Sequence, residues 1–315
     1  SLLWDLLDAR SVRPNIFRDI ANRPQDRKMA ANIHFPTQNI KEPFFNLAAQ
    51  ALFECVFHYI QRNIKNPNNV SFKNFLNEYS DIKKLTRRLV TDSEIRPDIM
   101  AYFSSIVDEG KIDKTHTDIY STFYNKMRIY REPFFAQEGD FSLWEHVKNV
   151  SEGKSDKLLF IRFRQEDADL VLPYYQTVLA IALDRSISLQ KIYDHKNELP
   201  TAWICDEFPA WCKNNQYFGQ KTVTVIAEAQ KRGISVVVSA QSVGQLRQAL
   251  GPDGVSTLYD VCGNHMVLKL NDEMSAKHYS DMIGTREYTR EVSSSSSGLN
   301  VGMSMGGPGI GFSPG

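Results

Sequence analysis

The 315-residue sequence lacks an excess of charge of either sign, a long hydrophobic run and more than a few cysteines. Lysine plus arginine and aspartate plus glutamate total 37 each, so no global field favours nucleic acid or an anionic membrane, and such a partner must use a local patch. No apolar run approaches the roughly 20 residues of a membrane span, and no signal peptide is recognisable. The 18 phenylalanines and 13 tyrosines supply bulky side chains to bury, which predicts a globular chain.

The cysteines and histidines do not follow the spacing of a metal site. Cys55, Cys205, Cys212 and Cys262 form no C-x-x-C pair, and the seven histidines show no H-x-x-x-H or H-E-x-x-H pattern. Three of the cysteines lie in or beside apolar segments, which is typical of buried free thiols in a reducing compartment. The sequence therefore indicates neither a zinc site nor a disulfide framework.

A phosphate-binding glycine loop is also missing. Residues 152–155 read EGKS, but the first glycine of G-x-x-x-x-G-K-[ST] would fall on Lys148. EGKS also precedes an apolar, strand-like segment, whereas a P-loop follows a strand and opens a helix. We interpret it as a polar turn.

The first half of the chain has the periodicity of helices. Residues 42–61 carry Pro43 at a helix start and apolar residues on nearly every side, which predicts a buried helix packed against a sheet. From about residue 70 to residue 131 the segments are amphipathic, with no convincing strand between them. We expect a small helical insert over residues 67–133.

The second half alternates between strand-like and helix-like segments. They are LLFIRF at 158–163, a helix starting at Pro173, AWICD at 202–206, a helix through 226–231, ISVVVSA at 234–240 and a last strand, HMVLKL, at 265–270. Strands separated by helices predict βαβ units in a parallel sheet covered on both faces, so the fold class is α/β. The segment from Ser293 onward is rich in Ser, Gly and Met and is expected to be a flexible tail.

Polar side chains follow two of the predicted strands. Asp206 and Glu207 come directly after AWIC, and Gln241 follows ISVVVSA. Ligands of parallel α/β sheets bind beyond the carboxyl ends of adjacent strands, where one carboxylate can hold Mg²⁺ and a second can orient a water. The alternatives are an acidic turn for the carboxylates and a polar residue at a helix start for Gln241.

Two groups of basic residues have simpler interpretations beside functional ones. Lys83, Lys84, Arg87 and Arg88 are expected on one side of a helix, as a solvated face or as a docking face for nucleic acid or protein. Lys231 and Arg232 close a helix before Gly233, where cations interact favourably with the helix dipole. Arg232 could in addition reach a phosphate held by a neighbouring subunit.

Several short segments also occur in an order and spacing that resemble one family. They are Trp4 to Asp8, Glu42 to Phe45, Leu158 to Ile161, Trp203 to Pro209, Glu228 and Ala229 with Gly233, Ser239 to Ser242 with Gln245 and Leu246, Gly263 and Asn264, Leu268 to Asp272, Ala276, Ser280, Ile283 and Gly284. Together they resemble the type IV secretion system coupling proteins, the RecA-like, inner-membrane ATPases of conjugation and effector export. The likeness covers nearly the whole chain.

The resemblance implies a RecA-like P-loop NTPase core with an inserted all-α domain. It divides the chain into a discontinuous nucleotide-binding domain at 1–66 and 134–292, the all-α insert at 67–133 and the tail at 293–315. Since the chain begins at Ser1 without Met, we expect a fragment of a longer protein in which the P-loop and the membrane anchor lie upstream of Ser1.

The resemblance also implies roles for single residues. Asp206 would serve Mg²⁺, Glu207 would be the catalytic carboxylate and Gln241 would sense the γ-phosphate of ATP. Many relatives carry Arg directly after the Glu-Ala pair, where this sequence has Gln230. Arg232, two residues later, is then the candidate for a contact across a subunit interface.

The resulting hypothesis is a hexameric ATPase at the cytoplasmic face of the bacterial inner membrane. It would hydrolyse ATP to deliver a relaxosome DNA-protein complex or effector proteins to a type IV secretion channel. The insert would bind substrates or adaptors, and DNA would pass through the central channel. The alternatives are a double-stranded DNA translocase of the partition or packaging type, which lacks such an insert, and a non-hydrolysing substrate receptor.

Overall fold

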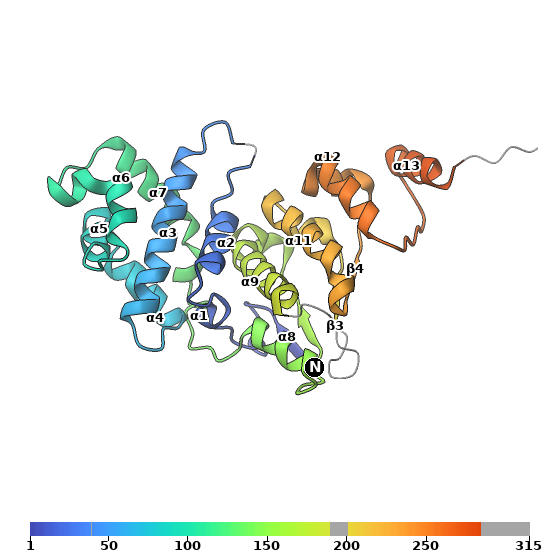
Figure 1. Cartoon of the computed structure of the whole chain (residues 1–315), viewed down its shortest axis with the longest axis horizontal. Coiled ribbons are helices and arrows are strands. Elements are labelled where there is room, and N and C mark those ends of the chain that lie inside the picture. The colour runs from blue at the N-terminus through green and yellow to red at the C-terminus, as the bar shows by residue number, and fades with distance from the viewer. Residues whose placement is uncertain (39, 190–200, 285–315) are drawn as a thin grey trace, which may run out of the picture.

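The computed structural model describes residues 1–38, 40–189 and 201–284, and its first half is helical. After the short strand β1 (Leu2–Trp4) come α1 (Ile16–Asp19), α2 (Pro24–His34), α3 (Phe44–Asn63), α4 (Asn69–Glu78), α5 (Ile82–Leu89), α6 (Arg96–Asp108) and α7 (Lys114–Lys126). Figure 1 shows α3 to α7 gathered at one end of an elongated molecule. No strand interrupts the described residues between 70 and 131, as the sequence predicts.

The helices of this end begin where the sequence supplies caps. The side chain of Asn68 accepts a hydrogen bond from Ser71 N at the start of α4, and Asp113 does the same for His116 N at the start of α7. Pro43 directly precedes α3, as predicted. The expectation that α3 packs against a sheet is wrong. Its apolar sides are covered by helices α2, α6 and α7, so its near-continuous hydrophobicity reflects burial among helices.

The second half alternates helices with strands, as predicted. It contains α8 (Leu143–Ser151), β2 (Leu159–Ile161), α9 (Ala168–Leu189), β3 (Thr201–Cys205), α10 (Phe208–Trp211), α11 (Gln216–Ala229), β4 (Ile234–Val238), α12 (Val243–Val261) and α13 (Glu273–Ile283), with 3₁₀ turns η1 (Ile129–Arg131), η2 (Gln165–Asp167) and η3 (Gln230–Arg232). The EGKS segment is the predicted turn between α8 and β2.

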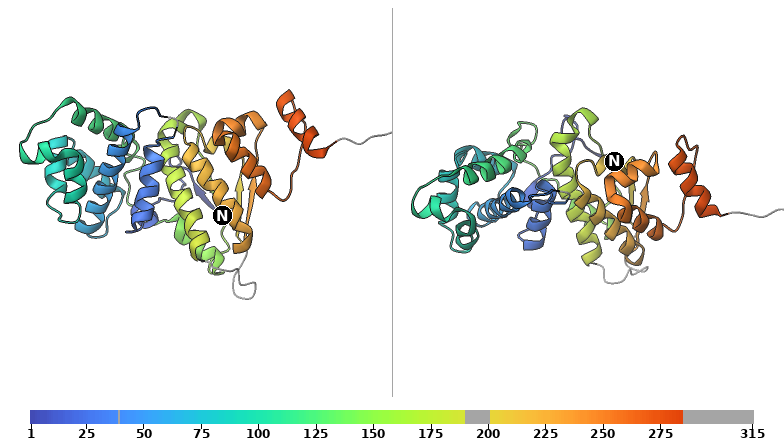
Figure 2. Two further views of the ribbon diagram at one scale, coloured as in Figure 1. Left: turned by 45° about the horizontal axis from the view of Figure 1, so that its top comes forward. Right: turned by 90° about the horizontal axis from the view of Figure 1, so that it is seen from above.

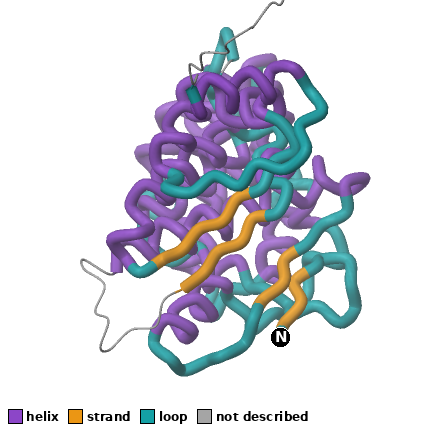
Figure 3. The backbone as a smooth tube through the Cα atoms, turned by 90° about the vertical axis from the view of Figure 1, so that its right-hand side faces the viewer, coloured by secondary structure: helices purple, strands orange, loops and turns teal. Residues whose placement is uncertain are grey.

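The described strands form two parallel pairs, β1 with β2 and β3 with β4 (Figure 3). The parallel arrangement confirms the predicted class. The expected cover on both faces is wrong for the described residues, because Ile204 is 76% exposed and Val237 is 53% exposed on the outer face of β3 and β4. Alternate residues of these strands, including Trp203 and Val236, face the core instead.

Two further predicted elements differ from the structure. Residues 265–270 form no strand, and Met266 and Leu268 are 89% and 80% exposed. An alternating apolar pattern becomes a strand only when a neighbouring strand offers its hydrogen bonds, and no described strand lies beside this segment. The helix predicted to start at Pro173 starts at Ala168, since a proline near a helix start removes a single backbone hydrogen bond.

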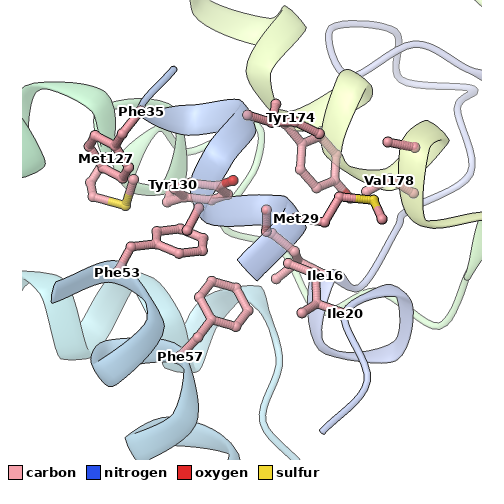
Figure 4. Close-up of a cluster of buried hydrophobic side chains, with 14 of the residues drawn as sticks. Ile16, Ile20, Met29, Phe35, Phe53, Phe57, Met127, Tyr130, Tyr174 and Val178 are labelled. Atoms are coloured by element: carbon pink, nitrogen blue, oxygen red, sulfur yellow. The ribbon is translucent and has the colours of Figure 1, made fainter. Parts of the chain in front are cut away.

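A continuous aromatic core joins the helical end to the strand-bearing part. Tyr130 on η1 lies between Phe53 of α3 and Tyr174 of α9, and all three rings are buried (Figure 4). The Tyr130 and Tyr174 rings meet edge to face, with centroids 6.4 Å apart. Burying each such side chain stabilises the fold by roughly 1.5–3 kcal/mol, and the shared core holds the two regions in one arrangement.

The two regions lie side by side in both views of Figure 2. Helices α2 and α9 pack along each other between them, and α11 packs against both α9 and α12. The domain boundaries expected at residues 66 and 133 stay a prediction. The expected tail from Ser293 lies outside the described residues.

Candidate functional site

The candidate site is the loop edge at which β3 and β4 end together. Cys205, the last residue of β3, pairs with Val238, the last residue of β4. Asp206 and Glu207 therefore emerge directly beside Ser239, and Gln241 follows before α12 begins. The parallel register alone brings these side chains to one edge, because parallel strands present their carboxyl ends on the same side.

Glu207 has a backbone conformation that is uncommon for a residue with a Cβ atom. Its φ and ψ are both 50°, in the left-handed region, where it serves as the residue before α10. This conformation costs an ordinary L-residue roughly 1–2 kcal/mol. Such positions persist when the surrounding contacts hold them, and they concentrate at functional sites.

Hydrogen bonds join the predicted residues across the two strand ends. Gln241 Nε2 donates to Glu207 Oε1 at 2.6 Å. Ser239 Oγ donates to Asp206 Oδ1 at 2.6 Å and accepts from Glu207 N at 2.9 Å. The structure thus places Asp206, Glu207 and Gln241 in one cluster, and it adds Ser239 as the residue that connects Asp206 with Glu207.

The cluster borders a cavity of about 610 Å³. Its lining is mostly amide side chains and includes both Glu207 and Gln241; the other lining residues are Pro36, Gln38, Gln165, Pro209, Ala210, Cys212, Lys213, Asn214, Asn215, Gln216, Gln245, Gln248 and Ala249. Lys213 is the one lysine or arginine among these lining residues, and it is paired with Asp169 at 3.1 Å. The cavity therefore offers many hydrogen-bonding groups and few charges to whatever occupies it.

The carboxylates of this cluster suit a cation that keeps most of its water ligands. Asp206 Oδ1 is engaged by Ser239, and in the described part of the chain its Oδ2 has no protein partner. No group of three or more His, Cys, Asp or Glu side chains able to hold a metal occurs among the described residues. Mg²⁺ commonly binds through one or two carboxylates plus water and phosphate oxygens, so Asp206 fits this ion better than one that needs a full protein cage.

The cysteine that precedes the carboxylates is inert at neutral pH. Burial raises the pKa of Cys205 to about 11, and it raises the pKa of Cys212, after α10, well above its usual value. A thiol in this state is a poor nucleophile and a poor metal ligand. The chemistry of the loop edge therefore belongs to its carboxylates and amides.

Arg232 lies at the opposite end of β4 from Gln241. The whole strand separates them, which is a distance of about 16 Å for five residues. Arg232 therefore does not belong to the cluster of its own chain. Its Nε and Nη1 atoms are buried and have no hydrogen-bond partner among the described residues. The Gly233 that follows has a positive φ of 67°, which confirms the predicted glycine cap.

The basic residues of α5 lie on its outer side, as predicted. Ile82, Leu85 and Leu89 are buried while Lys84 and Arg87 are exposed. Arg88 also lies over the ring of Tyr59, 5.4 Å from its centroid. A solvated face explains these contacts fully, and the docking interpretation stays a prediction.

Sequence reasoning missed Ser239 and the amide-lined cavity. The hydroxyl of Ser239 is recognisable as part of the site only once the register places it opposite Asp206. The sequence marks Ser239 only as part of the segment Ser239 to Ser242, two residues before Gln241, and this position predicts no contact with Asp206. The amides come from loops and helices far apart in the chain, so no local pattern marks them.

Solved structures of a conjugative coupling protein share this architecture. The chain is similar to the bacterial conjugative coupling protein TrwB lacking its first 70 residues, in complex with sulphate, with a TM-score of 0.53 and 15% sequence identity over 83% of this chain and 56% of that one. It also matches TrwB with ADP and Mg²⁺, with a TM-score of 0.52 and 15% identity over 82% of this chain and 57% of that one. These likenesses define the fold as RecA-like with an all-α domain.

The sequence comparison then places the chain in a family. Residues 2–305 match the family described as type IV secretion-system coupling protein DNA-binding domain, and the chain belongs to this family. It is 23% identical over 287 residues to coupling protein TraD of Escherichia coli (strain K12), which covers 90% of this chain and 37% of TraD. The chain thus spans about a third of that relative and little more than half of the solved TrwB chains. None of the described helices is long and apolar enough to cross a membrane.

Proposed function

We propose that the chain supplies the hydrolytic side of the nucleotide site of a coupling ATPase that serves type IV secretion or conjugation. In this role the complete gene product would hydrolyse ATP to recruit DNA-protein or protein substrates and deliver them to the secretion channel. Two findings support the proposal: membership of the coupling protein family, and TrwB structures that contain ADP with Mg²⁺ or a non-hydrolysable ATP analogue.

One observation in this chain carries the proposal. Glu207, held in a left-handed conformation, meets Gln241 from the neighbouring strand at the edge of the cavity, with Asp206 beside it. An acidic turn would need neither an amide from the next strand nor an unfavourable backbone angle. This geometry supports a role for these residues in acting on a ligand beyond the strand ends.

Each residue has a distinct role in the proposed reaction. Asp206 would hold the hydrated Mg²⁺, which supplies charge neutralisation at the phosphates. Glu207 would orient the attacking water and accept its proton, and Gln241 would fix the Glu207 carboxylate and respond to the γ-phosphate. The 315-residue sequence contains no G-x-x-x-x-G-K-[ST] loop, so the groups that cradle the phosphates would have to come from outside this chain.

The assembly and its location are further parts of the proposal. We expect a homo-hexamer at the cytoplasmic face of the bacterial inner membrane, with the all-α insert binding relaxosome or effector substrates and their adaptors. Arg232 lies far from the cluster of its own chain, and its Nε and Nη1 atoms have no hydrogen-bond partner among the described residues, so it would contact the nucleotide of a neighbouring subunit. DNA would pass through the central channel of the ring.

The test replaces Glu207 by Gln in the complete gene product. Loss of the carboxylate removes the proton acceptor and leaves the size and the hydrogen bond to Gln241 nearly unchanged, so turnover should fall by about 100-fold or more. Binding of a fluorescent ATP analogue should stay within about twofold of the unmodified protein. Glu273→Gln, at the exposed start of α13, is the matched control and should change neither quantity.

The outcomes separate the competing functions. Undiminished hydrolysis in the Glu207→Gln protein contradicts the assignment of Glu207. A complete gene product that binds ATP without hydrolysing it, with or without DNA, supports the non-hydrolysing receptor instead. Hydrolysis that depends wholly on double-stranded DNA, with an insert that binds no secretion substrate, supports a DNA translocase.

A further inference from the structure

We propose that Ser239 is a positioning residue of this site, one that sets the conformations of Asp206 and Glu207 without touching a substrate. The inference rests on the proposed ATPase function. It goes beyond that function, whose roles are given to Asp206, Glu207, Gln241 and Arg232. The argument begins with the position of Ser239 in the register.

Ser239 directly follows Val238, the last residue of β4 that pairs with β3. Its backbone N–H donates to Cys205 O at 3.0 Å, and its carbonyl accepts from Phe208 N at 2.9 Å. Cys205 directly precedes the two carboxylates and Phe208 directly follows them. The backbone of Ser239 therefore fixes both ends of the Asp206–Glu207 pair.

The side chain of Ser239 makes two further hydrogen bonds, to Asp206 and Glu207 themselves. Its hydroxyl donates to Asp206 Oδ1 at 2.6 Å and accepts from Glu207 N at 2.9 Å. The first bond orients the Asp206 carboxylate so that Oδ2 remains for a cation. The second helps to retain Glu207 in its left-handed conformation, which points its carboxylate toward Gln241.

Ser239 would act as a group that orients a metal-binding carboxylate by a hydrogen bond without binding the metal itself. A ligating carboxylate that is itself hydrogen-bonded is held in one orientation, and loss of such a partner typically costs about 10–100-fold in metal affinity or activity. Without the hydroxyl, Asp206 would rotate more freely and Glu207 would lose one of the bonds that offset its backbone strain. Both changes weaken catalysis while the nucleotide-binding groups stay in place.

The experiment compares three variants in the complete gene product. Ser239→Ala removes the hydroxyl, Ser239→Thr keeps it, and Ser235→Ala removes an exposed hydroxyl from the same strand as a matched control. Ser239→Ala should lower kcat by about 10-fold or more and raise the Mg²⁺ concentration for half-maximal hydrolysis by a similar factor. KM for ATP should stay within about twofold, and the other two variants should behave like the unmodified protein.

A second measurement needs no turnover. Mn²⁺ binding in the presence of a non-hydrolysable ATP analogue, followed by electron paramagnetic resonance, should weaken about 10-fold or more in Ser239→Ala and remain unchanged in Ser235→Ala. Asp206→Asn provides the reference for loss of the ligand itself. Circular dichroism checks that each variant is folded, which the exposed position of Ser239 favours.

The results distinguish failure of this inference from failure of the proposed function. If Asp206→Asn weakens Mn²⁺ binding and hydrolysis but Ser239→Ala matches Ser235→Ala, the positioning role is overturned and the ATPase assignment stands. If Ser239→Thr is as impaired as Ser239→Ala, the hydroxyl is not the cause and the inference also fails. If Asp206→Asn is unimpaired, the metal assignment of the proposed function is itself wrong, and the role of Ser239 falls with it.

Discussion

Asp19 should make the stability of this protein decrease as the pH rises toward neutrality. The carboxyl group is buried, and burial raises its pKa to about 7, against hydrogen bonds from Ser142 Oγ and Trp144 N that favour the charged form. Its Oδ2 atom is buried with no hydrogen-bond partner among the described residues. The folded protein therefore binds a proton that the unfolded chain releases near pH 4.

The magnitude follows from the difference in pKa between the two states. A rise from 3.8 to about 7 is close to three units, which corresponds to about 4 kcal/mol. The contribution is present in full below pH 4 and is lost as the pH rises to 7. His34 acts in the opposite direction, because burial lowers its pKa from 6.5 to about 4, so about 3 kcal/mol is lost as the pH falls through that range.

The substitution Asp19→Asn separates the effect of Asp19 on the pH dependence of stability from that of His34. Asparagine keeps the acceptor for Ser142 and Trp144 and carries no charge at any pH. Relative to the unmodified protein, the variant should gain up to about 4 kcal/mol in unfolding free energy between pH 4 and pH 8. With the opposing carboxyl group removed, the acid destabilisation caused by His34 should become visible below pH 6.5.

Urea unfolding followed by circular dichroism, at half-unit steps from pH 4.5 to pH 8.5, measures this difference. Ser235→Ala, an exposed substitution on β4 that adds and removes no titratable group, is the control and should give a difference that does not change with pH. A constant difference between Asp19→Asn and the unmodified protein across the whole range, within about 0.5 kcal/mol, would refute the reasoning.

Two further predictions concern packing and buried hydrogen bonds, and thermal unfolding checks both. Gly139→Ala should destabilise the fold by about 2 kcal/mol or more, because its Cβ would lie 2.4 Å from a backbone oxygen, whereas Gly263→Ala, which meets no atom within 4 Å, should stay within about 0.5 kcal/mol. Tyr130→Phe should cost about 1–3 kcal/mol, since it leaves the buried Nε2 of His34 without its donor. Tyr174→Phe, which removes a buried hydroxyl that has no partner among the described residues, should be neutral or stabilising, and equal losses in the two variants would contradict the argument.

The sequence was sufficient to predict β2, β3, β4 and the carboxylate edge because they depend on local patterns and a general topological rule. The apolar runs that end at Cys205 and Val238 form paired parallel strands, and this pairing brings Asp206, Glu207 and Gln241 together. The rule that ligands bind at the carboxyl ends of parallel strands does not predict side-chain contacts or backbone angles at those ends. The hydroxyl of Ser239 and the left-handed angle of Glu207 depend on the register and on backbone geometry that no single residue encodes.

Two of the wrong predictions share one physical cause, which is that burial and pairing partners are not local properties. Residues 265–270 have the apolar, strand-like composition of a β-strand, but no described strand lies beside them, and Met266, Val267 and Leu268 are exposed. The uniform hydrophobicity of α3 correctly predicts burial, yet the partners are helices and not a sheet. The period of the hydrophobic residues specifies which face of an element is buried. The tertiary arrangement decides which other element covers that face.

The loop edge combines features that lower stability, and their coincidence is the strongest argument that the edge is functional. A glycine at position 207 would relieve the left-handed backbone, and an apolar residue at 206 would avoid placing two carboxylates in succession. The chain instead retains both carboxylates and holds them with Ser239 and Gln241, whose side chains make no comparable contribution to the core. Backbone strain that is maintained by side-chain hydrogen bonds is expected where residues must keep one geometry to bind a ligand. The strain at this loop edge therefore supports the function proposed for it, because the fold alone does not require it.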